Sequence, residues 1–170
     1  MEEAPQPADD TERSGRILDG LRAFGANYTE FTDRFAAWLG LHSTDARALV
    51  EILYAEDKGT PLSPTRLSER LALTTGATTN LLNRLERLGH IVRTREQADR
   101  RAVTLRSSKE IEAPAREFFG PLAVHLDALV AQYPPEQLDQ FERFLDGLRV
   151  SMNELLAEQA EASGRSEGKP

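Results

Sequence analysis

The chain has 170 residues and a formal net charge of −7, and at this length we expect one domain with appendages. It contains no cysteine, which excludes disulfides, thiolate zinc sites, iron–sulfur clusters and sensing by thiol oxidation. Its longest apolar stretch, Phe35 to Leu41, is far shorter than the ~20 residues of a membrane-spanning helix, so we expect a cytoplasmic protein.

The first part of the chain predicts a tail followed by a long helix. Residues 1–12 are polar and lack periodicity, as do residues 160–170 at the other end, so we predict two disordered tails. Over 13–40 the apolar residues recur at alternating steps of four and three, which is typical of a helix–helix seam. The seam consists of Ile17, Leu21, Phe24, Tyr28, Phe31, Phe35 and Trp38.

The middle part, residues 41–107, has the pattern of a compact lobe. A helix is predicted over 43–56, and Ser63-Pro64 pairs a capping residue with Pro at the first position of a short helix. Thr74 caps a third helix over 75–88, which Gly89 ends. Residues 91–96 and 102–106 predict two β-strands, joined by the loop 97–101. Helix, short helix, turn, helix and hairpin is the order of a winged helix-turn-helix.

This lobe also concentrates the basic charge. Residues 64–106 hold nine Arg, no Lys and four acidic residues, a net charge of +5, whereas the rest of the chain holds 12 basic and 24 acidic residues, a net charge of −12. Such asymmetry indicates an anion-binding module on a scaffold that is kept away from polyanions. Arg scattered over a solvated surface is the plainer alternative.

The third helix of the lobe is the candidate recognition helix. Ala77, Leu81, Leu85 and Leu88 share one face, and the other positions carry small hydroxyls, amides and a glycine instead of Glu/Lys pairs. Such groups can approach another surface closely and bond to base edges or phosphates, although an ordinary polar face is the alternative. Together with Arg84 at its later turn, the candidate DNA contacts are Thr74, Thr75, Gly76, Thr78, Thr79, Asn80 and Asn83.

The hairpin supplies further candidate DNA contacts. Arg93 and Arg95 alternate along the first strand and so point to one side, and Arg100 and Arg101 lie at the loop tip beside Asp99. Two adjacent Arg at a tip suit a narrow minor groove, and Asp99 is expected to pair with one of them and orient it. The alternative is a mobile loop without a role.

Residues 108–159 predict two more helices. Ser107 followed by Glu110 suits a capping box at the start of the first, and Pro114 and Pro121 predict that this helix is bent or begins late. Pro135 is tolerated as the first residue of the second, which carries another seam. That seam consists of Leu138, Phe141, Leu145, Leu148, Met152 and Leu155.

The two seams need partner helices. They either pack against each other within one chain or intertwine with those of a second copy. We favour the homodimer, because seams of this length exceed what a small central lobe can cover. The predicted fold is therefore mainly α with a small β-wing: a winged helix-turn-helix lobe, and a helical dimerisation domain formed by residues 13–40 and 108–159.

At this point the residues resemble the multiple antibiotic resistance regulator (MarR) family of bacterial transcription factors. The match is most specific over LTTGATTNLLNRLERLGHIVRTREQADRRAVTL, from Leu73 to Leu105, and includes an Asp-Arg-Arg signature at Asp99-Arg100-Arg101. The resemblance implies a homodimer on a pseudo-palindromic DNA site, with half-sites ~34 Å apart, one recognition helix in each major groove and wing Arg at the minor grooves. One departure is that Ser107, Ser108 and Ile111 stand where the family usually continues Leu-Thr-x-x-Gly, so the junction after the wing is expected to differ.

The resemblance also implies a response to small aromatic or phenolic acids bound between the dimerisation helices and the lobe. Packing in the core is the more ordinary role for the residues that suit such a pocket. These residues are Tyr28, Trp38, His42, Arg47, Phe118 and Phe119.

The sequence does not favour an enzyme or a metal protein. It has no GxSxG, P-loop or HExxH motif, and its three His have no metal-ligand spacing, so we expect no cofactor and no metal. The predicted function is sequence-specific DNA binding by a transcriptional regulator, as a ligand-responsive repressor, with double-stranded DNA and a second copy as partners. A dimeric helical adaptor, or a small-molecule-binding protein that has lost DNA binding, is the alternative.

Overall fold

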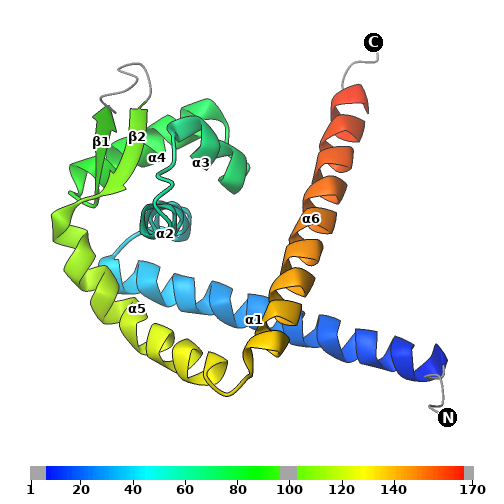
Figure 1. Ribbon diagram of the computed structural model, residues 1–170. Helices are drawn as coiled ribbons and strands as arrows, with labels where there is room; N and C mark the ends of the chain where they lie inside the picture. The colour runs from blue at the N-terminus through cyan, green and yellow to red at the C-terminus, as the bar shows by residue number, and fades with distance from the viewer. Residues whose placement is uncertain (1–6, 96–102, 167–170) are drawn as a thin grey trace. The chain divides into compact units, whose positions relative to one another are not determined.

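The computed structural model describes residues 7–95 and 103–166, with side chains over 11–95 and 103–159. It contains, in chain order, α1 (Pro7–Leu39), α2 (Ser43–Asp57), α3 (Pro64–Leu71), α4 (Thr75–Arg87), β1 (Ile91–Arg95), β2 (Val103–Ser107), α5 (Lys109–Val130) and α6 (Pro135–Ser166) (Figure 1). The prediction of a mainly α fold with a small β-wing is confirmed. Among the described residues, none of the helices has both the length and the apolar character of a membrane span.

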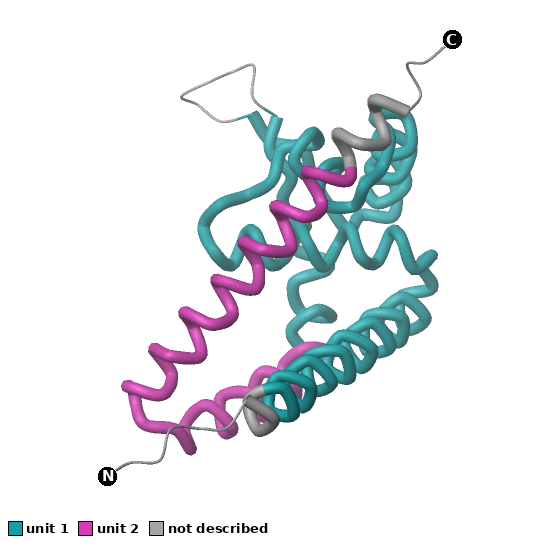
Figure 2. The backbone as a smooth tube through the Cα atoms, turned by 90° about the vertical axis from the view of Figure 1, so that its right-hand side faces the viewer, with its two compact units in different colours: residues 1–118 teal, residues 119–170 magenta. Residues whose placement is uncertain are grey.

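The chain divides into two compact units, coloured separately in Figure 2. The first comprises residues 1–118 and includes α1 to α4, the hairpin and the start of α5. The second comprises residues 119–170 and includes the rest of α5 and all of α6. The candidate DNA contacts that the structure describes all lie in the first unit.

The core of the first unit gathers apolar side chains from every one of its elements. Phe35 of α1 is fully buried, and Leu67 of α3 and Leu105 of β2 are buried as completely. The remaining members come from α2, α4, β1 and the start of α5: Leu49, Ile52, Leu81, Leu82, Leu85, Ile91 and Ile111. This shared core fixes α4 and the hairpin on one scaffold.

The hairpin is a two-stranded antiparallel sheet. Ile91 pairs with Ser107 and Arg95 with Val103 at its two ends, and Thr94 and Thr104 share a hydroxyl hydrogen bond of 2.8 Å on one face. The Leu105 N–H also donates to the carbonyl of Leu62 at 2.7 Å, which ties β2 to the segment before α3. Both predicted strands are confirmed within one residue at their described ends, whereas the loop between them lies outside the described residues.

The helix boundaries correct several predictions. Helix α1 begins at Pro7, inside the predicted tail, because Pro suits a first helical turn. Helix α6 extends to Ser166, since the run from Leu156 to Ala162 consists of strong helix formers. Helix α5 begins at Lys109 and continues through both prolines to Val130, so neither proline delays or ends it.

The first turn of α5 is capped by Ser108 and not by Ser107. The Ser108 hydroxyl accepts from the Ile111 N–H at 3.3 Å and donates to the Gly89 carbonyl. Ser107 instead gives its N–H and hydroxyl to Glu56 of α2, at 2.8 and 2.6 Å. The junction after the wing is therefore built from two serines with separate partners.

Candidate nucleic-acid interface

The local sequence gives α4 a well-defined N-terminal cap. The Thr74 hydroxyl accepts from the Ala77 N–H at 3.2 Å, as its predicted cap role requires. The preceding α3 is capped in the same way by Ser63, which accepts from Arg66 N–H at 3.2 Å. Between them Ala72 adopts a left-handed conformation with φ of 52°, so the tight turn of the helix-turn-helix lies here.

The buried face of α4 differs from the predicted one. Thr78, Leu81, Leu82 and Leu85 are buried, whereas Ala77 is exposed and Leu88 is 55% exposed. The Thr78 hydroxyl donates to the Thr74 carbonyl at 3.0 Å. Thr78 is therefore a core residue, and its prediction as a DNA contact is wrong. In the sequence, Leu81, Leu82 and Leu85 follow Thr78 at steps of three, four and seven, and this helical spacing indicates that Thr78 shares their face.

The opposite face of α4 is open. Thr75, Gly76, Thr79, Asn80 and Asn83 are all exposed, and a side chain added at Gly76 would meet nothing within 4 Å. A partner surface can therefore approach the first turn closely, where the free N–H groups and the helix dipole favour an anion. The structure brings these five predicted contacts together on one surface.

Arg84 has another role. Its guanidinium donates twice to the carboxylate of Asp45 on α2, at 2.9 and 2.6 Å, and the Asp45 side chain is 2% exposed. Hydrogen bonding to Asp45 raises the pKa of Arg84. This pair joins α4 to α2 through Nε and Nη2 of Arg84, and a contact of Arg84 with DNA stays a prediction. The available signal in the sequence was Asp45, a single acidic residue on the apolar face of the predicted helix over 43–56, because a buried acid needs a partner.

Arg93 contacts α4, and Arg95 is an exposed residue two positions later on β1. Arg93 reaches from β1 to α4, donates to Asn83 Oδ1 at 2.8 Å and lies 3.5 Å from a carboxylate oxygen of Glu86. Arg95 is exposed near the end of β1. The wing residues Asp99, Arg100 and Arg101 lie outside the described residues. The partnership of Arg93 with Asn83 and Glu86 was not predicted from the sequence.

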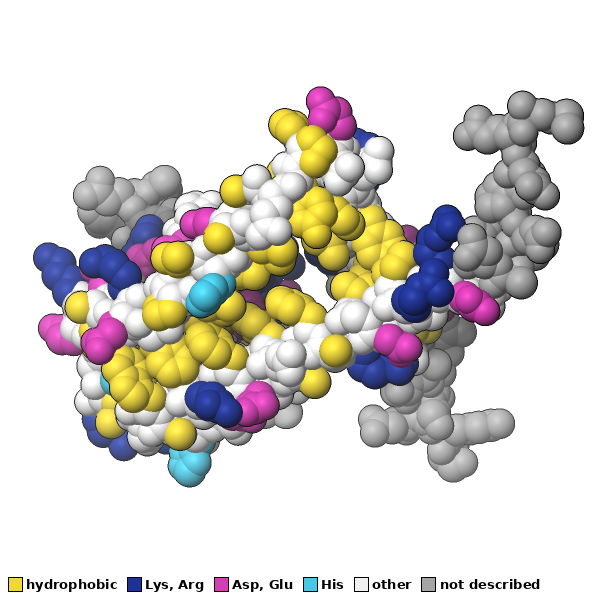
Figure 3. Space-filling view, turned by 90° about the horizontal axis from the view of Figure 1, so that it is seen from below, with side chains coloured by type: hydrophobic (Ala, Val, Ile, Leu, Met, Phe, Trp, Pro, Cys, Tyr) yellow, Lys and Arg dark blue, Asp and Glu magenta, His cyan; other side chains and the backbone are white. Residues whose placement is uncertain are grey.

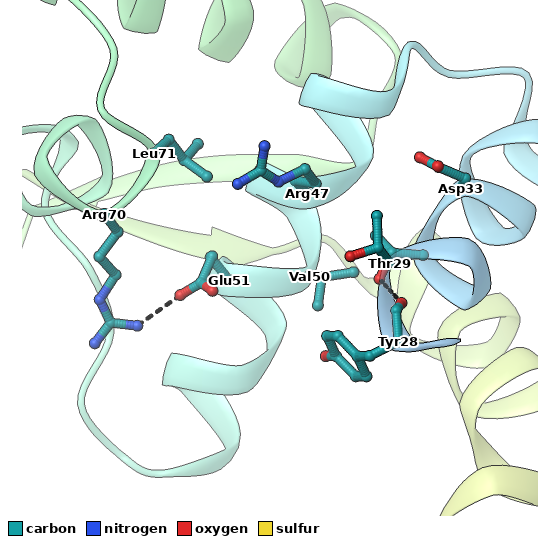
Figure 4. Close-up of a pocket in the computed structure, with 9 residues that line it drawn as sticks. Tyr28, Thr29, Asp33, Arg47, Val50, Glu51, Arg70 and Leu71 are labelled. Atoms are coloured by element: carbon teal, nitrogen blue, oxygen red, sulfur yellow. Dashed lines mark hydrogen bonds and ion pairs between the residues drawn. The ribbon is translucent and has the colours of Figure 1, made fainter. Parts of the chain in front are cut away.

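A second feature of the first unit is a pocket of about 380 Å³ between α1, α2 and α3. Arg70 donates to a carboxylate oxygen of Glu51 at 2.7 Å. Figure 4 shows this pair as a dashed line, with Tyr28 and Arg47 among the residues that line the same pocket. Burial and the nearby acid Glu51 raise the pKa of Tyr28, so its phenol stays protonated. The pocket thus offers a neutral hydroxyl, a carboxylate and two guanidinium groups.

The six predicted pocket residues are not brought together. Tyr28 and Arg47 line the pocket, but Trp38 and Phe118 pack in an aromatic cluster with Phe31 and Phe35, at centroid distances of 4.8–6.3 Å. His42 is the N-cap residue of α2 and makes no side-chain cap bond, and Phe119 belongs to the second unit. Trp38 and Phe118 thus contact other aromatic rings, as the plainer interpretation expects, whereas Tyr28 lines the pocket. No group of three or more potential metal ligands occurs in the described parts of the chain.

Comparison with known proteins gives consistent matches. A family model described as MarR family matches residues 39–102. The HTH-type transcriptional regulator YcgE of Bacillus subtilis is 28% identical over 136 residues, which cover 80% of this chain and 86% of that protein. The HTH-type transcriptional repressor YetL of the same organism is 28% identical over 116 residues, 68% of each chain.

Solved structures share the fold. A MepR mutant from S. aureus superposes with a TM-score of 0.61 at 19% identity, covering 80% of this chain and 96% of that chain. FabT of Streptococcus pneumoniae, in complex with DNA, gives a TM-score of 0.56 at 23% identity, covering 84% of this chain and 99% of that chain. At these identities the likeness concerns the fold alone, and the range of the family match overlaps the segment Leu73–Leu105 that carried the sequence resemblance.

Proposed function

We propose that the chain is a member of the MarR family, whose model matches its residues 39–102, and that it is a sequence-specific DNA-binding transcriptional repressor in the cytoplasm. The observation that carries this proposal is the open face of α4. Small hydroxyl and amide groups lie there uncovered, on a helix that a buried core and the Arg84–Asp45 pair hold in place. A rigid polar face of this kind suits the major groove.

The charge distribution supports the same partner. The segment 64–106 carries +5 within a chain of −7, and Arg87 and Arg95 are exposed on α4 and β1. Positive charge beside the open face of α4 attracts phosphates, whereas the acidic remainder repels them. The proposed binding surface comprises the open face of α4, Arg95, and the wing residues Asp99, Arg100 and Arg101.

We further propose that the protein acts as a homodimer. The seam residues Ile17, Phe24 and Tyr28 of α1 are 42–58% exposed, and Phe141, Leu145, Met152 and Leu155 of α6 are 48–52% exposed. Figure 3 shows apolar side chains uncovered on the face seen from below. Large apolar side chains exposed in rows indicate an interface, and a second copy of the chain offers the same rows.

Selection of bound duplexes from a random DNA pool tests the proposed function. The full chain is expected to enrich a pseudo-palindrome, and its affinity for that duplex should fall by roughly 10³-fold or more between 50 and 200 mM salt if six or more phosphates are contacted. Enrichment of no sequence, with no shifted DNA band at low salt, would identify the protein as an adaptor instead.

The pocket between α1, α2 and α3 is the proposed effector site, for a small aromatic acid. Arg47 has no hydrogen-bond or ion-pair partner among the described residues, so its guanidinium is available to a carboxylate, and the protonated phenol of Tyr28 can donate to the same group. Benzoate-class acids are expected to release the selected duplex from the wild type and from Arg34→Met, but not from Arg47→Met. Arg34 is an exposed residue of α1 paired with Glu30 outside the pocket. Equal release from both variants would remove Arg47 from the site.

A further inference from the structure

The orientation of the Asn83 side chain is fixed by its neighbour on the wing. Asn83 is exposed on α4, and one end of its amide lies 2.8 Å from a guanidinium nitrogen of Arg93. A guanidinium has five N–H donors and no acceptor. The amide atom facing it must therefore be Oδ1, and Nδ2 points elsewhere.

Arg93 is itself held from two sides. Its second terminal nitrogen lies 3.5 Å from Glu86 Oε2, and its side chain is 31% exposed. Its backbone lies in β1, paired with the fully buried Leu105 of β2. The guanidinium thus bridges two residues one helical turn apart on α4, which restrains the arginine and the amide together.

The free end of Asn83 can only donate. Among the residues that the structure describes, no protein acceptor bonds to its Nδ2. The usual contact of Asn with adenine needs Oδ1 and Nδ2 to face N6 and N7 together. With Oδ1 turned to β1, the group left for DNA is an N–H donor, which matches guanine N7 or O6, thymine O4 and adenine N7, but not cytosine, whose N4 amine only donates.

We propose that Asn83 reads a hydrogen-bond acceptor in the major groove, on guanine, thymine or adenine and against cytosine, and that Arg93 is the positioning residue that removes the usual two-bond preference of Asn for adenine. The inference rests on the proposed DNA-binding function. It makes Arg93 a determinant of sequence preference through Asn83, with its guanidinium held by Asn83 and Glu86 of α4.

Substitutions that change the hydrogen-bonding capacity test the proposal. A panel of duplexes carries each of the four base pairs at every half-site position, and the position whose preference Asn83→Ala abolishes identifies the base pair read by residue 83. There the wild type should disfavour cytosine by roughly 5- to 100-fold and should show no preference for adenine over guanine or thymine. Asn83→Asp leaves only acceptors, so the preference should invert to cytosine or adenine, whose exocyclic amines donate.

Arg93→Met and Arg93→Lys form a matched pair. Both keep a long side chain, but only Lys can donate to Oδ1. The Met variant frees Oδ1 to accept from adenine N6, so it should come to favour adenine at the Asn83 position, while the Lys variant keeps the wild-type order of preference. Thr79→Val, one turn earlier on the same face, should leave this position unchanged. Thermal unfolding of each variant verifies that it is folded. If Arg93→Met does not fold, Asn83→Asp still tests the proposal.

The outcomes separate the two levels of the account. If the wild type selects a sequence but favours adenine or cytosine at the Asn83 position, the inference is overturned while DNA binding stands. The inference is also overturned if Asn83→Ala alters the base preference at no position and only lowers the affinity for all sequences equally. It is overturned too if Asn83→Asp keeps the wild-type preference. If the wild type selects no sequence, the proposed function itself fails, and this inference with it.

Discussion

The pair of Arg84 and Asp45 shows how one polar contact holds the recognition helix. Asp45 is almost completely buried, whereas the Arg84 side chain is 42% exposed. Removal of either residue leaves the other without its ion-pair partner. Water can then solvate the partly exposed guanidinium of Arg84, whereas the carboxylate of Asp45 stays buried. The cost of breaking the pair should therefore depend on which member is removed.

Arg84→Ala should destabilise the fold more than Asp45→Ala does, because it leaves a buried carboxylate unpaired. Asp45→Ala should cost less, about 1.5–3 kcal/mol, since the arginine turns to solvent. Urea denaturation of both variants measures the difference. The ranking is contradicted if Asp45→Ala proves the more damaging change.

Glu56 couples stability to acid pH at the junction of β2 and α5. Burial raises its pKa, but hydrogen bonds from Ser107 and Arg106 outweigh this and hold it below its ordinary value of 4.5. Because the folded pKa is the lower one, the carboxylate stabilises the fold above about pH 4.5, and that contribution disappears as the pH falls through the lowered pKa. The stability difference between wild type and Glu56→Gln should be constant from pH 7 to about 5 and should shrink in stronger acid. Denaturation curves across this range check it, and a difference that persists undiminished at pH 3 would rule it out.

At the scale of elements, local signals predicted the helices better than their contacts. The caps at Ser63 and Thr74 depend on neighbouring residues alone, and both are confirmed. The pairing of Arg84 with Asp45 spans 39 residues of chain, which no periodicity can reveal. Thr78 was misplaced because Ala77 and Thr78 are both small, so two adjacent faces of α4 fitted the leucine spacing.

The structure also corrects the capping residue of α5, which is Ser108 and not Ser107. Ser108→Ala removes the acceptor for the Ile111 N–H and the donor to the Gly89 carbonyl, so it should cost about 1–2 kcal/mol. Ser151→Ala, at an exposed position inside α6, should cost nothing, because Ala is the better helix former. Thermal or urea unfolding compares the two, and equal stability of both variants would argue against a cap at Ser108.

The wing is the element whose proposed role depends most on charge. Replacing Arg100 and Arg101 together by Ala should weaken binding to all duplexes and reduce the salt dependence by about one unit of slope per lost phosphate contact. Arg143→Ala with Arg149→Ala removes the same charge from α6, at exposed positions, and should leave the slope unchanged. Titrations at several salt concentrations measure both. An equal loss in the two double variants would mean that net charge, and not the wing, is responsible.

At the scale of the whole molecule, position matters more than the sum of charges. A chain of −7 with a pI near 5.1 is not an obvious ligand for DNA, yet its basic residues are concentrated in the segment that contains α3, α4 and the hairpin. The exposed apolar rows on α1 and α6 were predicted from their spacing. The spacing does not reveal what packs on those rows, because a helix of the same chain and a helix of a second copy would bury them equally well.

Sedimentation equilibrium distinguishes the two cases. At micromolar concentration the mass should be twice the 18.9 kDa of one chain. Leu145→Glu places a charge on the α6 row and should shift the equilibrium toward single chains, whereas Glu142→Gln, at an exposed position beside that row, should not. A wild-type mass of 18.9 kDa would exclude the homodimer.

The central claim is that α4 and the wing bind DNA by sequence. Its most direct test is a titration of the full chain with the duplex selected from the random pool and with a scrambled duplex of the same composition, at one salt concentration near 150 mM. The account predicts at least ~10³-fold tighter binding to the selected duplex. Equal affinity for the two duplexes, or binding to neither, would contradict it.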